Sequence, residues 1–326
     1  MDRMKIGFLG AGHIANTMAR TVAKMPDVVA YAVASRDLGR AGAFANEHGF
    51  QKHYGSYEEL ASDAGVDLVY IATPHSHHFD HAMLCLEHGK PVLCEKAFTA
   101  NAPQARRLLG YAKERRILVA EAIWTRYMPL SAKINEVLDS GIIGAPLLLT
   151  ANLGYLISHN KRITDPALAG GALLDVGVYP INFASMAFGD KVDEVSSDAV
   201  MFGTGVDAMN NITMRFAGGR TAFLYSTAVS QTDREGVIYG DRGHLVVDNI
   251  NNPERIRVIS LEREEVARYE APQQISGYEY QIRSVAKALA ENRIECPEMP
   301  HREIIRIMEI MDGIRATWGM RFPFEQ

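Results

Sequence analysis

Two short stretches of the sequence carry side chains that could move a proton together. The first, Pro91 to Lys96, is an apolar run that predicts a buried strand with Glu95 and Lys96 at its carboxyl end. In an open parallel sheet this end faces the ligand crevice, so a rigid strand would deliver the Lys96 ammonium group to a binding site. The structural alternative is a lysine that only begins a surface loop, which is the commoner situation.

The second stretch runs from Gly170 to Pro180 and is apolar apart from Asp175 and Tyr179. It predicts a helix, on which residues four apart share a face. An unperturbed tyrosine has a pKa of about 10, too high for efficient base action near neutrality. A neighbouring lysine cation would favour the phenolate and lower that pKa. The alternative is an ordinary helix tyrosine with Asp175 as its hydrogen-bond partner.

A glycine-rich loop near the start of the chain could bind a dinucleotide. The apolar run Lys5 to Leu9 predicts a strand, and a helical pattern begins shortly after it. The loop between them, Gly10-Ala11-Gly12-His13-Ile14-Ala15, matches the G-x-G-x-x-G/A fingerprint. Its glycines permit a tight turn and a close approach of a pyrophosphate, which the helix amides then face. We expect cofactor contacts from Gly10, Gly12, His13 and Ile14.

The end of the next predicted strand, Val28 to Ala34, bears on the choice of cofactor. An NAD site normally has an acidic residue there, bound to the ribose 2′-hydroxyl. This chain has Ser35 and Arg36, with Arg40 one helical turn further on, and these groups suit a 2′-phosphate. We therefore predict NADP as the cofactor, while the nearby Asp37 leaves NAD use open. Alternatively, the two arginines are solvated charges at the start of a helix that Asp37 caps.

A histidine-rich segment, Thr73-Pro74-His75-Ser76-His77-His78, follows the predicted strand Val66 to Ala72. Its spacing is not that of a helical histidine pair flanked by a general base, and no carboxylate cluster completes a metal site. We predict no metal. Helix capping and cofactor contacts by Thr73, Pro74, His75 and His78 are the expected roles.

The order of elements predicts two domains, since 326 residues exceed what one hydrophobic core usually supports. Strands and helices alternate in the first half, which is typical of an α/β Rossmann fold with a doubly wound parallel sheet. The second half has six short β-branched runs, which predict an α+β domain with a large, open, mostly antiparallel sheet. The expected division is residues 1–124 for NADP binding and 125–326 for substrate binding and oligomerisation. Helices expected at 278–291 and 302–318 would pack back on the first domain.

Composition excludes some classes of function. The net charge of -5 gives no basic footprint for nucleic acid. The three cysteines, Cys85, Cys94 and Cys296, lack metal-ligand spacing and are typical of reduced thiols in a cytoplasmic protein. No apolar run reads as long enough to span a bilayer, and no signal peptide precedes the first strand. We therefore expect a soluble, cytoplasmic protein with no membrane or nucleic-acid partner.

Five motifs in this order resemble the glucose-fructose oxidoreductase, inositol dehydrogenase and MocA family over nearly the whole chain. They are the loop Gly10 to Ala15, Ala72-Thr73-Pro74 with His75 and His78, Glu95-Lys96, Glu121 to Tyr127, and Gly170 to Tyr179. The last two resemble the branch of dimeric dihydrodiol dehydrogenases and NADP-linked D-xylose dehydrogenases.

The resemblance implies a role for individual residues. Lys96 and Tyr179 match the catalytic pair of the family, and Asp175 matches the acidic residue that supports them. Trp124 and Arg126 match residues that contact the cofactor, and we expect Glu95 and Lys96 to contact it as well. The family usually has proline after the Glu-Lys pair, where this chain has Ala97. A cis bond before alanine would cost roughly 2.5–4 kcal/mol, so we expect a slightly different direction for Lys96.

We therefore predict an NADP(H)-dependent dehydrogenase that acts on a hydroxyl or carbonyl carbon of a sugar, sugar derivative or trans-diol. Tyr155 and Arg162 are further substrate-contact candidates, and an exposed charged loop is the alternative for Arg162. A non-catalytic NADP(H)-binding sensor on the same fold is the rival function. A homodimer or higher oligomer is expected through the uncovered face of the second sheet. The members expected on this face are Met201, Met209, Met214 and Phe223.

Overall fold

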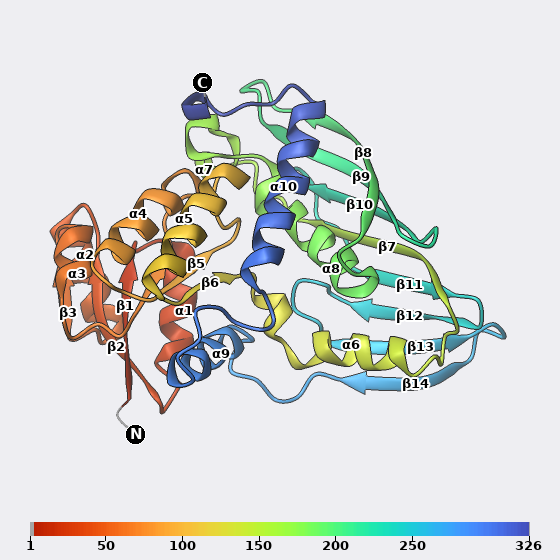
Figure 1. Cartoon of the computed structure of the whole chain (residues 1–326), viewed down its shortest axis with the longest axis horizontal. Helices are drawn as coiled ribbons and strands as arrows, with labels where there is room; N and C mark the ends of the chain where they lie inside the picture. Colours follow the sequence, from red (N-terminus) through yellow and green to blue (C-terminus); the bar gives the residue numbers. More distant parts are fainter. Residues whose placement is uncertain (1–2, 326) are drawn as a thin grey trace. The chain divides into compact units, whose positions relative to one another are not determined.

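The computed structural model of the chain describes residues 3–325, which group into two compact units (Figure 1). Unit 1 comprises Met1–Ala122 and Gln274–Ile305, and unit 2 comprises Ile123–Gln273 and Arg306–Gln326. The domain boundary predicted after residue 124 stays a prediction, as does the packing of the C-terminal helices on the first domain.

Unit 1 is built on a six-stranded parallel sheet with the order β3-β2-β1-β4-β5-β6. Its strands are β1 (Met4–Leu9), β2 (Val28–Ala34), β3 (Lys52–Tyr54), β4 (Leu68–Ile71), β5 (Val92–Glu95) and β6 (Val119–Ala122). Its helices are α1 (His13–Val22), α2 (Leu38–His48), α3 (Tyr57–Ser62), α4 (His75–Glu87), α5 (Ala102–Arg115) and α9 (Glu279–Ala290). The strand order reverses between β1 and β4, where such sheets bind ligands at their carboxyl ends. The predicted doubly wound parallel sheet is confirmed.

The sequence of unit 1 explains where its elements lie. Every residue of β4, β5 and β6 is buried, as expected of parallel strands covered on both faces. The side chains of Asp37 and Asn101 accept backbone N–H groups at the starts of α2 and α5. Ser56 and Glu59 form a capping box at the start of α3.

Unit 2 contains an eight-stranded sheet with the order β14-β13-β12-β11-β7-β10-β9-β8. Its strands are β7 (Pro146–Gly154), β8 (Val192–Met201), β9 (Asp207–Phe216), β10 (Thr221–Thr227), β11 (Gly236–Gly240), β12 (Gly243–Asp248), β13 (Arg255–Ser260) and β14 (Glu265–Glu270). Strands β7 and β10 pair in parallel and the other recorded pairs are antiparallel, which confirms the predicted mostly antiparallel sheet. Helices α6 (Pro129–Asp139) and α8 (Val178–Phe188) lie on one face of this sheet (Figure 1).

The other helical segments are short, apart from α10 (His301–Thr317). They are η1 (Trp124–Tyr127), α7 (Lys161–Thr164), η2 (Pro166–Leu168), η3 (Leu173–Gly177) and η4 (Pro323–Glu325). The segment η3 is a π-helix that runs directly into α8. The sequence pattern predicts a regular helix there, and the π-turn was not anticipated.

Two expectations were wrong. Met214 is buried in the core, because strand alternation places it opposite the exposed Met209 on β9. Met201, Met209 and Phe223 are exposed, at 38%, 40% and 49%. The segment Pro166–Phe188 is also long and apolar enough to cross a membrane by length and composition, contrary to the prediction that no run is. Most of it is buried, which is typical of a core helix.

Candidate active site

The glycine-rich loop joins β1 to α1 with the geometry that a dinucleotide site requires. Gly10 has a φ of 104°, and a Cβ atom there would lie 2.9 Å from the carbonyl oxygen of Ala72. At Gly12, which caps α1, a Cβ would meet no heavy atom within 4 Å. No described side chain caps the first amides of α1, so these amides and the open space at Gly12 fit a pyrophosphate. His13 is exposed and Ile14 is half-buried at the start of this helix.

The end of β2 presents an exposed pair of cations. Ser35 is buried, whereas Arg36 and Arg40 are exposed. The Arg40 guanidinium donates to the backbone oxygen of Ala11 at 2.8 Å, which ties α2 to the glycine-rich loop. Asp37 caps α2 by accepting the Arg40 backbone N–H at 3.0 Å, as the structural alternative supposed. That cap coexists with an arginine directed at the nucleotide loop.

Three aromatic side chains share the electrostatic surroundings of Arg36. The rings of Tyr57 and His81 lie 4.5 Å apart, and those of His77 and His81 lie 5.6 Å apart. Burial lowers the pKa of His81 to about 4, and the charges of His77, His78 and Arg36 act in the same direction. Burial and Arg36 likewise lower the pKa of His77. Burial is the main cause of both shifts, and the positive charge of Arg36 adds to it.

His78 connects the loops that follow β4 and β5. Its Nδ1 lies 2.9 Å from the Ala97 carbonyl oxygen and its Nε2 lies 2.7 Å from that of Thr73. Burial lowers the pKa of this fully buried imidazole, while the two carbonyl contacts raise it. The preceding residues Pro74 and His75 cap and begin α4.

Two buried carboxylates, those of Glu95 and Glu121, make hydrogen bonds near the loop that carries Lys96. Glu95 is 6% exposed and accepts a hydrogen bond from the Tyr70 hydroxyl at 2.5 Å. Burial, reinforced by Glu95, raises the pKa of Tyr70 well above its usual value. Glu121 is 1% exposed and accepts the Phe98 backbone N–H at 3.2 Å. Lys96 itself is half-buried. The peptide bond between Lys96 and Ala97 is cis, so the expectation that alanine would disfavour a cis bond at this position was wrong.

In unit 2, Asp175 lies in the π-turn and pairs with Arg162. The guanidinium donates to both carboxylate oxygens, with Nη1 to Oδ1 at 2.5 Å and Nη2 to Oδ2 at 3.3 Å. The side chain of Asp175 is 5% exposed and that of Arg162 is 43% exposed. This bidentate contact fixes the loop before Gly170 to the start of the helix.

Tyr179 belongs to a row of hydrogen-bonded side chains in unit 2. The indole Nε1 of Trp124 donates to the Tyr179 hydroxyl oxygen at 3.0 Å and to Asn251 Oδ1 at 2.9 Å. The Asn251 amide in turn donates to the Tyr155 hydroxyl oxygen at 2.9 Å. Tyr179 and Trp124 are 5% and 6% exposed. Sequence reasoning missed Asn251, which follows β12 in a turn without a motif.

Two further contacts anchor the helix that carries Tyr179. Arg126, a predicted cofactor contact, donates its Nε to Asn182 Oδ1 at 2.5 Å. At the other end, buried Asp207 accepts the Leu173 backbone N–H at 2.8 Å. Gly171, with a φ of 112°, allows this approach, because a Cβ there would lie 2.3 Å from Asp207 Oδ1.

The predicted catalytic residues therefore lie in both units, with Lys96 in unit 1 and Asp175 and Tyr179 in unit 2. Their union in one site stays a prediction. Within residues 3–325, no group of three or more His, Cys, Asp or Glu side chains could hold a metal ion.

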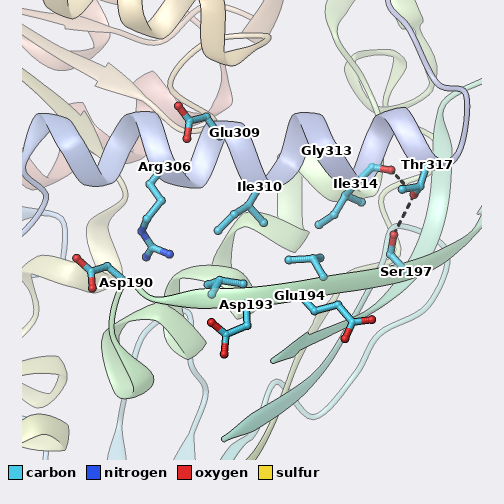
Figure 2. Close-up of a pocket in the computed structure, with 12 residues that line it drawn as sticks. Asp190, Asp193, Glu194, Ser197, Arg306, Glu309, Ile310, Gly313, Ile314 and Thr317 are labelled. Carbon is cyan, nitrogen blue, oxygen red and sulfur yellow. Dashed lines mark hydrogen bonds between the residues drawn. The ribbon is translucent and has the colours of Figure 1, made fainter. Parts of the chain in front are cut away.

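A separate cavity of about 400 Å³ lies between β8 and α10 within unit 2 (Figure 2). Ile310 and Ile314 face it from the helix, and acidic side chains of β8 such as Asp193 and Glu194 line the opposite side. It shares no lining residue with the predicted site.

A Rossmann-type sheet with an open glycine loop is typical of a dinucleotide-binding protein. Residues 4–122 match the family model described as "Oxidoreductase family, NAD-binding Rossmann fold", and residues 131–246 match the GFO/IDH/MocA C-terminal domain. The chain belongs to the GFO/IDH/MocA family. It is an enzyme, and its first unit supplies an NAD(P)-binding fold.

Named relatives cover nearly the whole chain. The trans-1,2-dihydrobenzene-1,2-diol dehydrogenase of Mus musculus is 33% identical over 98% of both chains, and that of Homo sapiens is also 33% identical over 98% of both. Among solved structures, KijD10, a 3-ketoreductase from Actinomadura kijaniata in complex with NADP and TDP-benzene, superposes with a TM-score of 0.88. It is 25% identical, and the match covers 97% of this chain and 98% of that chain.

Proposed function

We propose that this enzyme is an NADP(H)-dependent dehydrogenase or reductase of a sugar, sugar derivative or trans-diol, with Tyr179 as its acid and base. The observation that carries the proposal is the hydrogen bond from Trp124 Nε1 to the Tyr179 hydroxyl oxygen. Since the indole nitrogen is only a donor, it leaves the phenolic proton directed elsewhere and stabilises a phenolate after that proton has gone. The diol named for the dihydrodiol dehydrogenases supports a diol substrate. The 3-ketoreductase activity named for KijD10 supports chemistry at a carbonyl carbon.

Each residue has a part in the proton transfer. A bound nicotinamide would supply the hydride transfer at the alcohol or carbonyl carbon. Tyr179 takes the hydroxyl proton in the oxidation and returns it in the reduction. Lys96 holds the same substrate oxygen and favours the phenolate. Asp175, fixed by Arg162, orients the loop at the start of the helix.

We assign NADP rather than NAD because of the charge at the end of β2. Arg36 and Arg40 are exposed beside the nucleotide loop, and Arg40 already reaches Ala11. The phosphate of NADP would complete charge-assisted hydrogen bonds with these groups. The complex of the related ketoreductase with NADP supports the same choice.

The test is Tyr179→Phe, with Tyr111→Phe as the matched control because Tyr111 lies on α5 and has no part in the proposed site or interface. We expect kcat to fall 10²- to 10⁴-fold in Tyr179→Phe while NADPH affinity changes less than twofold. The control keeps the rate of the natural chain. Absorbance of the reduced nicotinamide is followed with a panel of sugars, ketosugars and trans-diols. Wild-type turnover by Tyr179→Phe would refute the role of the phenol.

We also propose that the protein forms a homodimer or higher oligomer through the uncovered face of the second sheet. Strand pairing places Val200, Met209, Phe223, Tyr225 and Tyr239 on this face, and each is at least 37% exposed. An apolar surface of this kind is rarely left in water. Light scattering at micromolar concentration tests the proposal, and a monomeric mass would contradict it.

The reduced, buried state of the three cysteines supports a cytoplasmic location.

A further inference from the structure

Asn251 lies beside the proposed acid and base and has hydrogen-bonding capacity to spare. Its amide oxygen accepts one hydrogen bond, from Trp124, and its amide nitrogen donates one, to Tyr155. An asparagine side chain offers two acceptor positions and two donor hydrogens. Among the contacts described for residues 3–325, one acceptor position and one hydrogen therefore remain for a ligand. The residue is half-buried, so a ligand can reach it.

The distances place this amide close to the Tyr179 oxygen. Both oxygens bond to the same indole nitrogen, at 3.0 Å and 2.9 Å, so they are at most 5.9 Å apart, the sum of the two distances. Two neighbouring hydroxyls of one molecule, each making a hydrogen bond of about 2.8 Å, can span such a gap. The Tyr155 hydroxyl extends the polar row, because it accepts from Asn251 and keeps its own proton to donate.

We infer that Asn251, with Tyr155, recognises the hydroxyl next to the reacting carbon and so selects vicinal diols and sugars over simple alcohols. The inference rests on the proposed function, since it assigns the reacting oxygen to Tyr179. A buried polar group built to bind a substrate hydroxyl discriminates against a substrate without it, because its own hydrogen bond is then lost.

The experiment compares one diol with its analogue that lacks the second hydroxyl, in the full-length enzyme. For Asn251→Ala, we expect kcat/KM for the diol to fall at least about tenfold, mainly through KM, while the value for the analogue stays within about twofold. Tyr155→Phe removes a single hydroxyl and should give a smaller loss, in the diol alone. NADPH affinity is measured in each variant to verify that the cofactor site is intact.

Other outcomes separate the two levels of inference. If the natural chain oxidises neither compound nor any member of the wider panel, the proposed function fails. If the natural chain oxidises the diol, and Asn251→Ala lowers kcat/KM equally for the diol and its analogue, the proposed function is retained. The role of Asn251 is then refuted. A change confined to the pH profile would also refute it, because Asn251 would then act only by sharing the Trp124 N–H with Tyr179.

Discussion

Replacing Asp207 by asparagine should make the protein more stable at neutral pH. Asp207 is fully buried on β9, and burial raises its pKa from 3.8 to about 6, although its contacts with Asn210 and Leu173 act in the opposite direction. Its Oδ1 has no hydrogen-bond partner among the described residues, whereas Oδ2 accepts from both neighbours. Asparagine keeps the accepting oxygen and removes the buried charge.

The magnitude follows from the pKa difference. Because the folded pKa lies above the unfolded one, the stability present below pH 3.8 is lost as the pH rises through about 6. A difference of about two pKa units corresponds to about 3 kcal/mol above that range. Asp207→Asn mimics the protonated state, so we expect a gain of about 3 kcal/mol at pH 8 that falls to roughly half of that at pH 5.

Thermal unfolding at pH 8 and pH 5 measures this gain. Asp198→Asn is the matched control, since it neutralises an exposed acid on the adjacent strand β8 and should change stability by less than about 0.5 kcal/mol at either pH. Asp207→Ala should destabilise by about 1–3 kcal/mol, because the Leu173 N–H and the Asn210 amide lose their acceptor. A destabilised Asp207→Asn at pH 8 would refute the reasoning and show that the charge is needed by its donors.

Three further predictions test the parts of the site. Gly171→Ala should destabilise the protein by at least about 2 kcal/mol, because the residue has a positive φ and lies next to a buried carboxylate. Gly110→Ala is the control, since Gly110 faces open space on α5, and it should stabilise the protein by about 0.5–1 kcal/mol. Thermal midpoints of the two variants distinguish these outcomes. Glu121→Leu removes the acceptor of the Phe98 N–H, and it should lower kcat about tenfold while NADPH affinity is preserved. Glu121→Gln keeps an acceptor and should lower kcat less. Arg40→Gln should weaken NADPH binding about tenfold and leave NADH binding unchanged in fluorescence titrations. Equal loss for both nucleotides would assign Arg40 to the loop alone.

Much of the fold could be predicted because its signals are local. The strand Val28–Ala34 was predicted with both of its ends, and the cap at Asp37 was anticipated. Strand β3 was missed because it has only three residues, two of them exposed. Strand β13 alternates buried Ile256 and Val258 with charged residues, a period-two pattern that could have revealed it.

The site was less predictable because its contacts join distant parts of the chain. Trp124 and Asn251 are 127 residues apart in the sequence, and only the tertiary structure brings their side chains into contact. Asn251 stands in a turn, where no periodicity or motif marks it. The pairing of Arg162 with Asp175 likewise depends on how the loop folds back, so the sequence could propose both residues but not their contact.

The π-turn explains why spacing alone was a poor guide to the relation between Asp175 and Tyr179. In an α-helix residues four apart share a face, whereas a π-turn bonds residues five apart and shifts the side chains that precede it around the axis. Asp175 lies inside Leu173–Gly177, and Tyr179 lies in the first turn of α8. Asp175 is accordingly fixed by Arg162, while Tyr179 receives the indole N–H of Trp124. The irregular turn thus allows two side chains of one short segment to contact different partners. Turns of this kind are frequent at functional sites.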